Sequence, residues 1–162
     1  MNARDMVRNS LAIGDRFINS YIGDLEDADL LVRPLPGMNH IAWQLGHLIG
    51  SERNIVELVK PGSCPALPDD FEEGHGRQKF NVDDPSKFYP KAKYLELWKK
   101  QREATLAVLE TLTEADFDRA EEKFPQMAPT VGRLMGICGD HPIMHAGQFV
   151  AVRKLLNKPV TI

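Results

Sequence analysis

The segment Val131–Leu155 reads VGRLMGICGDHPIMHAGQFVAVRKL and contains the feature that decides the fold, a long repeat of apolar residues at helical spacing. At 3.6 residues per turn, one side of this helix carries Val131, Leu134, Ile137, His141, His145, Gln148, Val152 and Leu155. Thr130 is a suitable cap at its start, and Asn157 with Pro159 can end it. A long helix with one apolar side predicts a fold in which it packs against other helices.

Three other segments repeat apolar residues at the same spacing and are predicted to be helices. The first covers Ala3–Tyr21, and the second begins after Asn39, a suitable N-cap, and ends before Pro61. The third begins at Pro90, since proline is tolerated in the first turn of a helix, and ends near Leu112. No segment shows the strict alternation of apolar and polar residues that predicts a strand. The predicted fold class is therefore all-α, a four-helix bundle.

The predicted second and third helices are separated by residues 61–89, which show no sustained apolar period. Prolines and glycines interrupt this segment repeatedly, so we expect a long irregular loop. Loops of this length in compact domains often act as lids or binding loops. His75 lies between two glycines here and is expected to be exposed to solvent. Cys64 would reach a functional site only if the loop folded over that site.

The composition is that of an ordinary globular chain and excludes several classes of function. A length of 162 residues suits a single domain, which we place at residues 1–162. The net charge of -3 provides no basic surface for nucleic acid or an anionic membrane. The N-terminus lacks a signal-peptide core, and no apolar run reaches the roughly 20 residues that span a bilayer. Two cysteines without a C-x-x-C motif fit the reducing cytoplasm, so we expect a cytoplasmic protein.

Two of the five histidines, His141 and His145, are four residues apart on the predicted last helix. Residues with this spacing lie one turn apart on the same side of a helix, so both imidazoles can point at one ion. The pair lies among apolar residues, where an unpaired imidazole is costly and a metal would satisfy both rings. A third histidine, His47, lies on the predicted second helix. The alternative is a pair of histidines on a polar stripe that binds no metal.

Pro142 directly follows His141 and removes one backbone N–H from the predicted helix. It also disfavours helical geometry at the residue before it. The segment can therefore kink, or can begin a new helix with Asp140 as its cap. A kink could aim the His141 side chain at a metal, but it could also spoil the spacing of the histidine pair.

Two motifs make the chain similar to a known family, His40–Leu48 (HIAWQLGHL) and Asp140–Gln148 (DHPIMHAGQ). With the helix order and the place of the loop, they resemble the DinB-like superfamily over nearly the whole chain. The resemblance implies a four-helix bundle and a metal held by three histidines. One ligand comes from the second helix and two from an H-x-x-x-H pair followed closely by Gly-Gln. The implied ligands are His47, His141 and His145, and the proline inside the pair departs from the more usual run.

Three histidine ligands leave one coordination position open, as in catalytic rather than structural metal sites. The resemblance implies a metal-dependent enzyme, because characterised relatives include transferases and isomerases that use low-molecular-weight thiols. We expect a thiol-dependent transferase or a hydrolase that acts on a small electrophile, with a divalent ion, zinc or nickel, as cofactor. Relatives often pair through helix faces, so a homodimer is expected. The alternatives are a non-catalytic bundle stabilised by metal and an interaction module.

Four further residues are candidates for contacts around the metal or the substrate: His40, Trp43, Glu52 and Gln148. His40 lies on nearly the same face as the histidine seven residues later, and either supports the site or is partly buried at the helix start. Gln148, one turn after His145, either bonds to a ligand or packs between helices. Trp43 is expected in the core or an interface. Glu52 lies on the apolar side of its helix, either at a rim in water or beside a partner.

Overall fold

The computed structural model describes residues 2–160 of the chain. Its helices are α1 (Ala3–Ile22), η1 (Ala28–Leu31), α2 (Ile41–Val59), α3 (Phe71–His75), η2 (Pro85–Lys87), α4 (Lys91–Thr111), α5 (Glu114–Asp118) and α6 (Val131–Leu155). Within these residues the only extended pairing is an isolated bridge between Ala120 and Thr130. The predicted all-α fold class is therefore confirmed for the described part of the chain.

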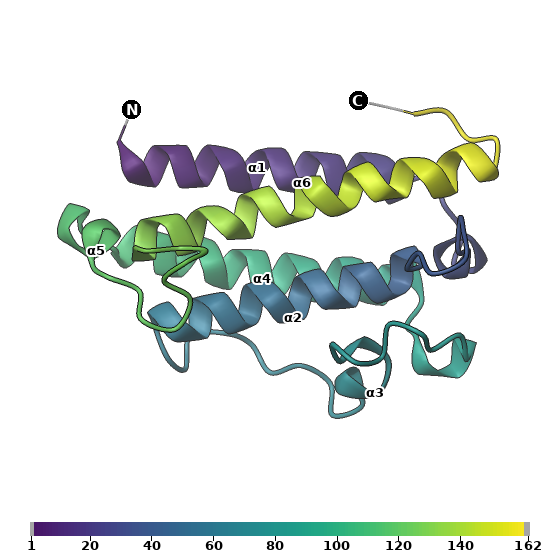
Figure 1. Cartoon of the computed structure of the whole chain (residues 1–162), viewed down its shortest axis with the longest axis horizontal. Helices are drawn as coiled ribbons and strands as arrows, with labels where there is room; N and C mark the ends of the chain where they lie inside the picture. The colour runs from purple at the N-terminus through teal and green to yellow at the C-terminus, as the bar shows by residue number, and fades with distance from the viewer. Residues whose placement is uncertain (1, 161–162) are drawn as a thin grey trace.

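The four long helices α1, α2, α4 and α6 lie side by side (Figure 1). The most extensive packing is between α1 and α6, α2 packs on both α4 and α6, and α4 also contacts α1. Each long helix therefore has two long neighbours, and α2 and α6 face each other directly. None of the helices formed by residues 2–160 combines the length and the apolar character needed to cross a bilayer.

Side-chain caps hold the first turns of α1, α2 and α6, whereas Pro90 at the start of α4 makes no side-chain cap hydrogen bond. The cap of α2 differs from the prediction. Thr130 caps α6, as predicted, by accepting a hydrogen bond from the backbone N–H of Arg133. For α2 the prediction of Asn39 was wrong, because the cap is His40. The His40 Nδ1 atom accepts from the backbone N–H of Trp43 at 3.1 Å. At this cap an imidazole nitrogen is the hydrogen-bond acceptor, in place of the side-chain oxygen of the usual Asn or Ser.

Pro142 lies inside α6, which continues without interruption from Val131 to Leu155. The backbones of α1 and α6 approach closely at this level: a Cβ atom on Gly14 would lie 3.0 Å from the carbonyl oxygen of Gly139 and 3.3 Å from the Cβ atom of Pro142. Asp140 does not cap a new helix, since its carboxylate accepts a hydrogen bond from the Ser10 hydroxyl on α1. The buried proline ring therefore serves the contact between α1 and α6.

The connection between α2 and α4 is more ordered than predicted, because it contains α3 and η2. The prediction that His75 is exposed was wrong: its side chain is 4% exposed. Its Nδ1 atom bonds to the carbonyl of Phe71 at 2.8 Å, and its Nε2 atom bonds to the Tyr94 hydroxyl at 2.6 Å. The ring lies so close to α2 that a Cβ atom on Gly46 would be 2.0 Å from His75 Cδ2. A buried histidine thus fastens this connection to α2 and α4.

The core consists of two apolar clusters with polar side chains between them. One cluster contains Ile18, Leu45, Tyr94 and Phe149, and the other contains Leu11, Val56, Leu109 and Met135. Between the clusters α1 contributes Asp15, α2 contributes Glu52, and α4 contributes Arg102 and Thr105, which hydrogen bonds and ion pairs join. We call these four residues the polar layer. His141 and His145 occupy the same interval on α6, between the parts of that helix that enter the two clusters.

Candidate metal centre

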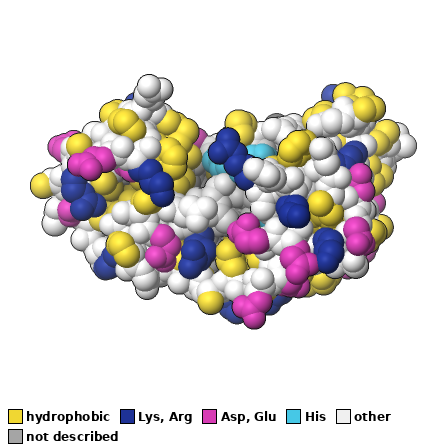
Figure 2. All heavy atoms as spheres, turned by 60° about the horizontal axis from the view of Figure 1, so that its bottom comes forward, with side chains coloured by type: hydrophobic (Ala, Val, Ile, Leu, Met, Phe, Trp, Pro, Cys, Tyr) yellow, Lys and Arg dark blue, Asp and Glu magenta, His cyan; other side chains and the backbone are white. Residues whose placement is uncertain are grey.

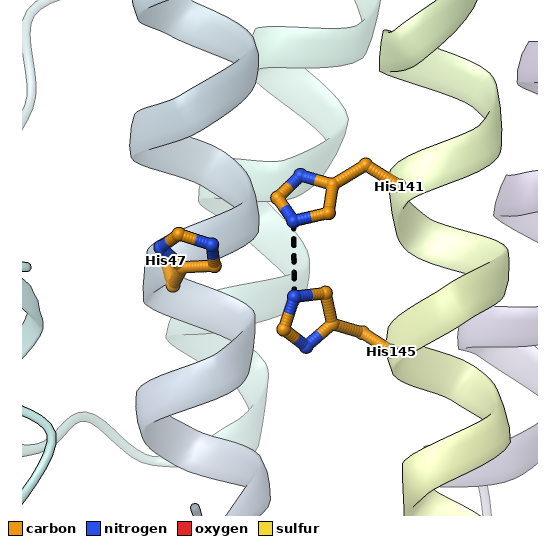
Figure 3. Close-up of side chains that lie close together, drawn as sticks. All are labelled: His47, His141 and His145. Atoms are coloured by element: carbon orange, nitrogen blue, oxygen red, sulfur yellow. Dashed lines mark hydrogen bonds between the residues drawn. The ribbon is translucent and has the colours of Figure 1, made fainter. Parts of the chain in front are cut away.

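His47 on α2 and the pair His141 and His145 on α6 converge on one point between the helices (Figure 3). One possible ligand atom from each of the three residues can be chosen so that all lie within 4.8 Å of one another. The Nε2 atoms of His141 and His145 are 3.0 Å apart. The centroid of the His47 ring lies 5.0 Å from that of His141 and 5.3 Å from that of His145. The structure therefore brings together the three histidines that the sequence singled out.

The donor atoms of this cluster fit a divalent ion. Two nitrogens at about 2.0–2.1 Å from a tetrahedral zinc ion are about 3.4 Å apart, so the 3.0 Å between His141 and His145 requires only a small opening. These two facing nitrogens can share only one proton when both rings are neutral. His47 makes no hydrogen bond with any other described residue, so its ring nitrogens are free to bind an ion. A cation at the centre would satisfy all three rings.

The three imidazoles are held in the neutral form that binds metal. Burial, with the charges of His141 and His47, lowers the pKa of His145 to about 3. Burial and the charge of His47 lower the pKa of His141 to about 4. The pKa of His47 is also lowered, by burial first and then by the positive charge of Arg77. At neutral pH none of the three rings therefore carries the second proton that would make it a cation and keep a metal ion away.

Gln44 is the residue around the cluster that the sequence analysis missed. Its Oε1 atom lies 2.7 Å from Nδ1 of His145, and its Nε2 atom donates to the carbonyl of Asn39 at 2.8 Å. The second bond identifies the oxygen as the atom that faces the ring, so His145 Nδ1 donates its proton to Gln44. The lone pair of His145 is thereby placed on Nε2, which points into the cluster. Metal-binding histidines are commonly oriented by such a bond on the second ring nitrogen.

Trp43 lies against the cluster and supports its third member. Its ring stacks on His47, with the centroids 4.9 Å apart and the planes inclined by 6°. The tryptophan is itself buried, as predicted, and one turn of α2 separates the two residues. Stacking on a fixed indole restricts the rotation of the His47 ring. Trp43 therefore contacts a candidate ligand without offering a ligand atom of its own.

Two other candidates make no hydrogen bond to the three histidines. His40 is 1% exposed, and both ring nitrogens have partners, with Nδ1 accepting from Trp43 N–H and Nε2 donating to the carbonyl of Val82. In this arrangement His40 offers no free nitrogen to a metal. Gln148 is half-buried, and the described residues provide no hydrogen-bond partner for its side chain. The amide that hydrogen-bonds to a candidate ligand is thus Gln44 on α2 and not Gln148 on α6.

Glu52 is buried beside partners rather than at a rim in water. Its side chain is 4% exposed, it accepts a hydrogen bond from the Thr105 hydroxyl, and its Oε2 atom lies 3.2 Å from Nη2 of Arg102. This Nη2 atom makes no hydrogen bond, so the contact between Arg102 and Glu52 is an ion pair without hydrogen-bond geometry. Burial raises the pKa of Glu52 to about 7, against the opposing effects of Arg102 and Thr105.

The comparison with known protein families agrees with this geometry. A family profile described as the DinB superfamily matches residues 17–149, a span that includes His47, His141 and His145. No curated protein matches the chain.

Proposed function

Because the chain belongs to the DinB superfamily, we propose that it is a metal-dependent enzyme whose cofactor is one divalent ion held by three histidines. His47, His141 and His145 would supply the ligands, and zinc or nickel is the proposed metal. The reaction would be transfer of a low-molecular-weight thiol to a small electrophile, or hydrolysis of that electrophile. When bound, the ion would lower the pKa of a thiol or a water molecule at its open position.

The observation that carries this proposal is the access of the cluster to solvent. His47 and His141 are half-buried, unlike His145, which is buried. Figure 2 shows histidine side chains in a hollow of the surface, beside Lys or Arg side chains. A site built only to hold helices together has no need of such an opening, whereas a substrate must reach the metal.

Arg77, in the connection after α3, would favour anionic substrates. Its side chain is exposed, and its positive charge is near enough to His47 to lower the pKa of that ring. A positive group at the mouth of a site raises the local concentration of anions, including thiolates and carboxylates. We therefore propose a thiol or an electrophile that carries negative charge.

The test is a turnover assay of the purified protein loaded with zinc or nickel. Low-molecular-weight thiols would be combined with a panel of small electrophiles, and electrophile hydrolysis without thiol would be followed in parallel. His141→Ala is the control, since it should lose both metal and turnover. A metal-loaded protein that accelerates neither thiol transfer nor hydrolysis would contradict the enzymatic part of the proposal.

A second candidate function is a metal site that only stabilises the fold. It is favoured by the origin of the ligands, because a bound ion would link α2 to α6. This alternative predicts that removal of the metal lowers the melting temperature and that azide does not perturb the spectrum of the cobalt-substituted protein. Binding of azide to the cobalt ion would support an open position and contradict the purely structural role.

We also propose that the protein is a homodimer. In support, α1 and α6 are neighbours that carry exposed apolar side chains, Met6 and Ile13 on α1 and Met144 and Leu155 on α6. Apolar side chains gathered on a surface are typical of protein interfaces, and two-fold dimers are the commonest oligomers. Sedimentation equilibrium tests this directly, and a monomer at all concentrations would contradict it.

A further inference from the structure

A small cavity separates Glu52 of the polar layer from His141 of the metal centre. It has a volume of about 10 Å³ and is lined by Leu48, Glu52 and Ile55 of α2 and by Ile137, Cys138, His141 and Pro142 of α6. This volume holds about one water molecule, which needs two to four polar partners. Glu52 and His141 supply a carboxylate and a ring nitrogen, and Cys138 adds a thiol. The cavity is therefore suited to one hydrogen-bonded water.

The cavity lies on the side of the His141 ring that faces away from His145. His145 is not part of its lining, whereas Ile137 and Cys138, one turn earlier on α6, are. The Nε2 atom of His141 points toward His145, at 3.0 Å, and Figure 3 shows the other ring nitrogen on the opposite edge. Nδ1 of His141 has no hydrogen-bond partner among the described residues. It is thus the polar atom of this ring that faces the cavity.

Metal binding would change the position of the proton on His141. Since Gln44 keeps the proton of His145 on Nδ1, the 3.0 Å contact between the two rings requires His141 to donate from Nε2. A metal at His141 Nε2 needs the lone pair of that atom. The neutral ring keeps one proton, which must then lie on Nδ1, and a buried N–H requires an acceptor.

Resting on the metal site proposed above, we infer that Glu52 is a positioning residue that accepts the Nδ1 proton of His141 through one water in this cavity. The carboxylate has acceptor capacity to spare, because Thr105 donates one hydrogen bond to it and the contact with Arg102 is an ion pair without hydrogen-bond geometry. Arg102 is itself held by Asp15 at 3.0 Å and by the carbonyl of Cys138 at 3.2 Å. The polar layer thus selects the tautomer of His141 that presents Nε2 to the ion.

The test is the zinc affinity of the metal-free protein, measured by competition with a chelator, for the parent, Glu52→Leu and Asp15→Asn. Leucine offers no hydrogen-bond acceptor, and loss of an outer hydrogen-bond partner of a ligand weakens metal binding about 10–100-fold, which we expect for Glu52→Leu. Asp15→Asn is the matched control. It removes a carboxylate from the same arginine but does not line the cavity, so its zinc affinity should stay within about threefold of the parent.

A second measurement covers the case in which Glu52→Leu folds poorly. In the zinc-loaded parent, ¹⁵N spectra of the histidine side chains, assigned with His141→Ala, should show a proton on Nδ1 of His141 that exchanges slowly with solvent. Equal zinc affinities of the parent and Glu52→Leu, or a zinc-bound Nδ1, would overturn the role of Glu52 while leaving the metal site intact. A parent that binds no zinc would overturn both the metal site and this inference.

Discussion

The side-chain oxygen of Gln44 on α2 accepts the Nδ1 proton of His145 on α6, at 2.7 Å. Both residues are buried, and the amide is fixed in turn by its bond to the carbonyl of Asn39. The helix that supplies one candidate ligand thereby orients a second ligand on its neighbour. The geometry of the cluster consequently depends on the packing of α2 against α6 as well as on the histidines themselves.

Replacement of Gln44 by leucine should weaken zinc binding about 10–100-fold, because the ring of His145 loses the acceptor that keeps its lone pair on Nε2. Gln148→Leu is the matched control, since that amide has no hydrogen-bond partner within residues 2–160 and should leave the affinity nearly unchanged. Chelator competition on the two variants and the parent measures the difference. Equal affinities of Gln44→Leu and the parent would show that the bond to Gln44 is not needed for binding.

The features that the sequence predicted well are those with a local cause. The apolar repeat after Thr130 predicted the last helix, which ends at Leu155, shortly before the predicted stop at Asn157. The spacing of His141 and His145 placed two rings on one side of it. Because neighbouring helices pack together, His47 could be expected close to that pair, and the family resemblance pointed to the same three residues.

The features that were missed or left open depend on partners far away in the chain. Glu52 is buried because Arg102 and Thr105, about fifty residues later, surround its carboxylate. His75 is buried because α2 offers a glycine for its ring to lie against, although its own flanking glycines resemble an exposed loop. Gln44 was visible in the quoted motif, three residues before His47, but only the approach of α6 gives its amide a function.

Removal of the arginine of the polar layer should be strongly destabilising. Arg102→Met leaves Glu52 buried without its positive partner, and breaking a buried pair in this way costs about 3–5 kcal/mol in the free energy of unfolding. Arg8→Met is the control, because Arg8 and Glu110 are paired at the surface and should contribute little. Urea denaturation at pH 7 of both variants checks the contrast. Similar small losses of unfolding free energy in Arg102→Met and Arg8→Met would mean that Glu52 becomes protonated without destabilising the fold.

The close contact of α1 with α6 predicts opposite effects for two glycines of α6. A Cβ atom on Gly139 would lie 2.2 Å from the Ser10 hydroxyl oxygen and 2.7 Å from the Ser10 backbone carbon. Gly139→Ala should therefore lower the free energy of unfolding by about 1–3 kcal/mol through overpacking. Gly136 has no atom within 4 Å of such a Cβ, so Gly136→Ala should raise it by about 0.5–1 kcal/mol. Equal effects in denaturation experiments would contradict the packing described.

The buried ring of His75 predicts a loss of stability in acid. Burial lowers its pKa from 6.5 to about 4, against the opposing hydrogen bond with the Phe71 carbonyl. The unfolded chain takes up this proton below pH 6.5 and the folded chain only near pH 4. The contribution of His75 is thus complete above pH 6.5 and is lost between pH 6.5 and 4, on the order of 3 kcal/mol.

The measurement is the free energy of unfolding of metal-free protein at pH 7 and pH 4, for the parent and His75→Phe. The difference between the two pH values should be smaller in the variant, since phenylalanine cannot be protonated. The other buried histidines contribute equally to both proteins and cancel in the comparison. The same difference in the parent and the variant would show that His75 does not resist protonation in the folded state.

The most direct test of the three-histidine site is the metal content of the untagged protein beside that of the His141→Ala/His145→Ala double variant. We expect close to one equivalent of a divalent transition metal in the parent, after purification or after reconstitution with zinc or nickel, and its loss in the variant. A parent that takes up no metal under either condition, or a variant that retains as much as the parent, would contradict the existence of a three-histidine metal centre.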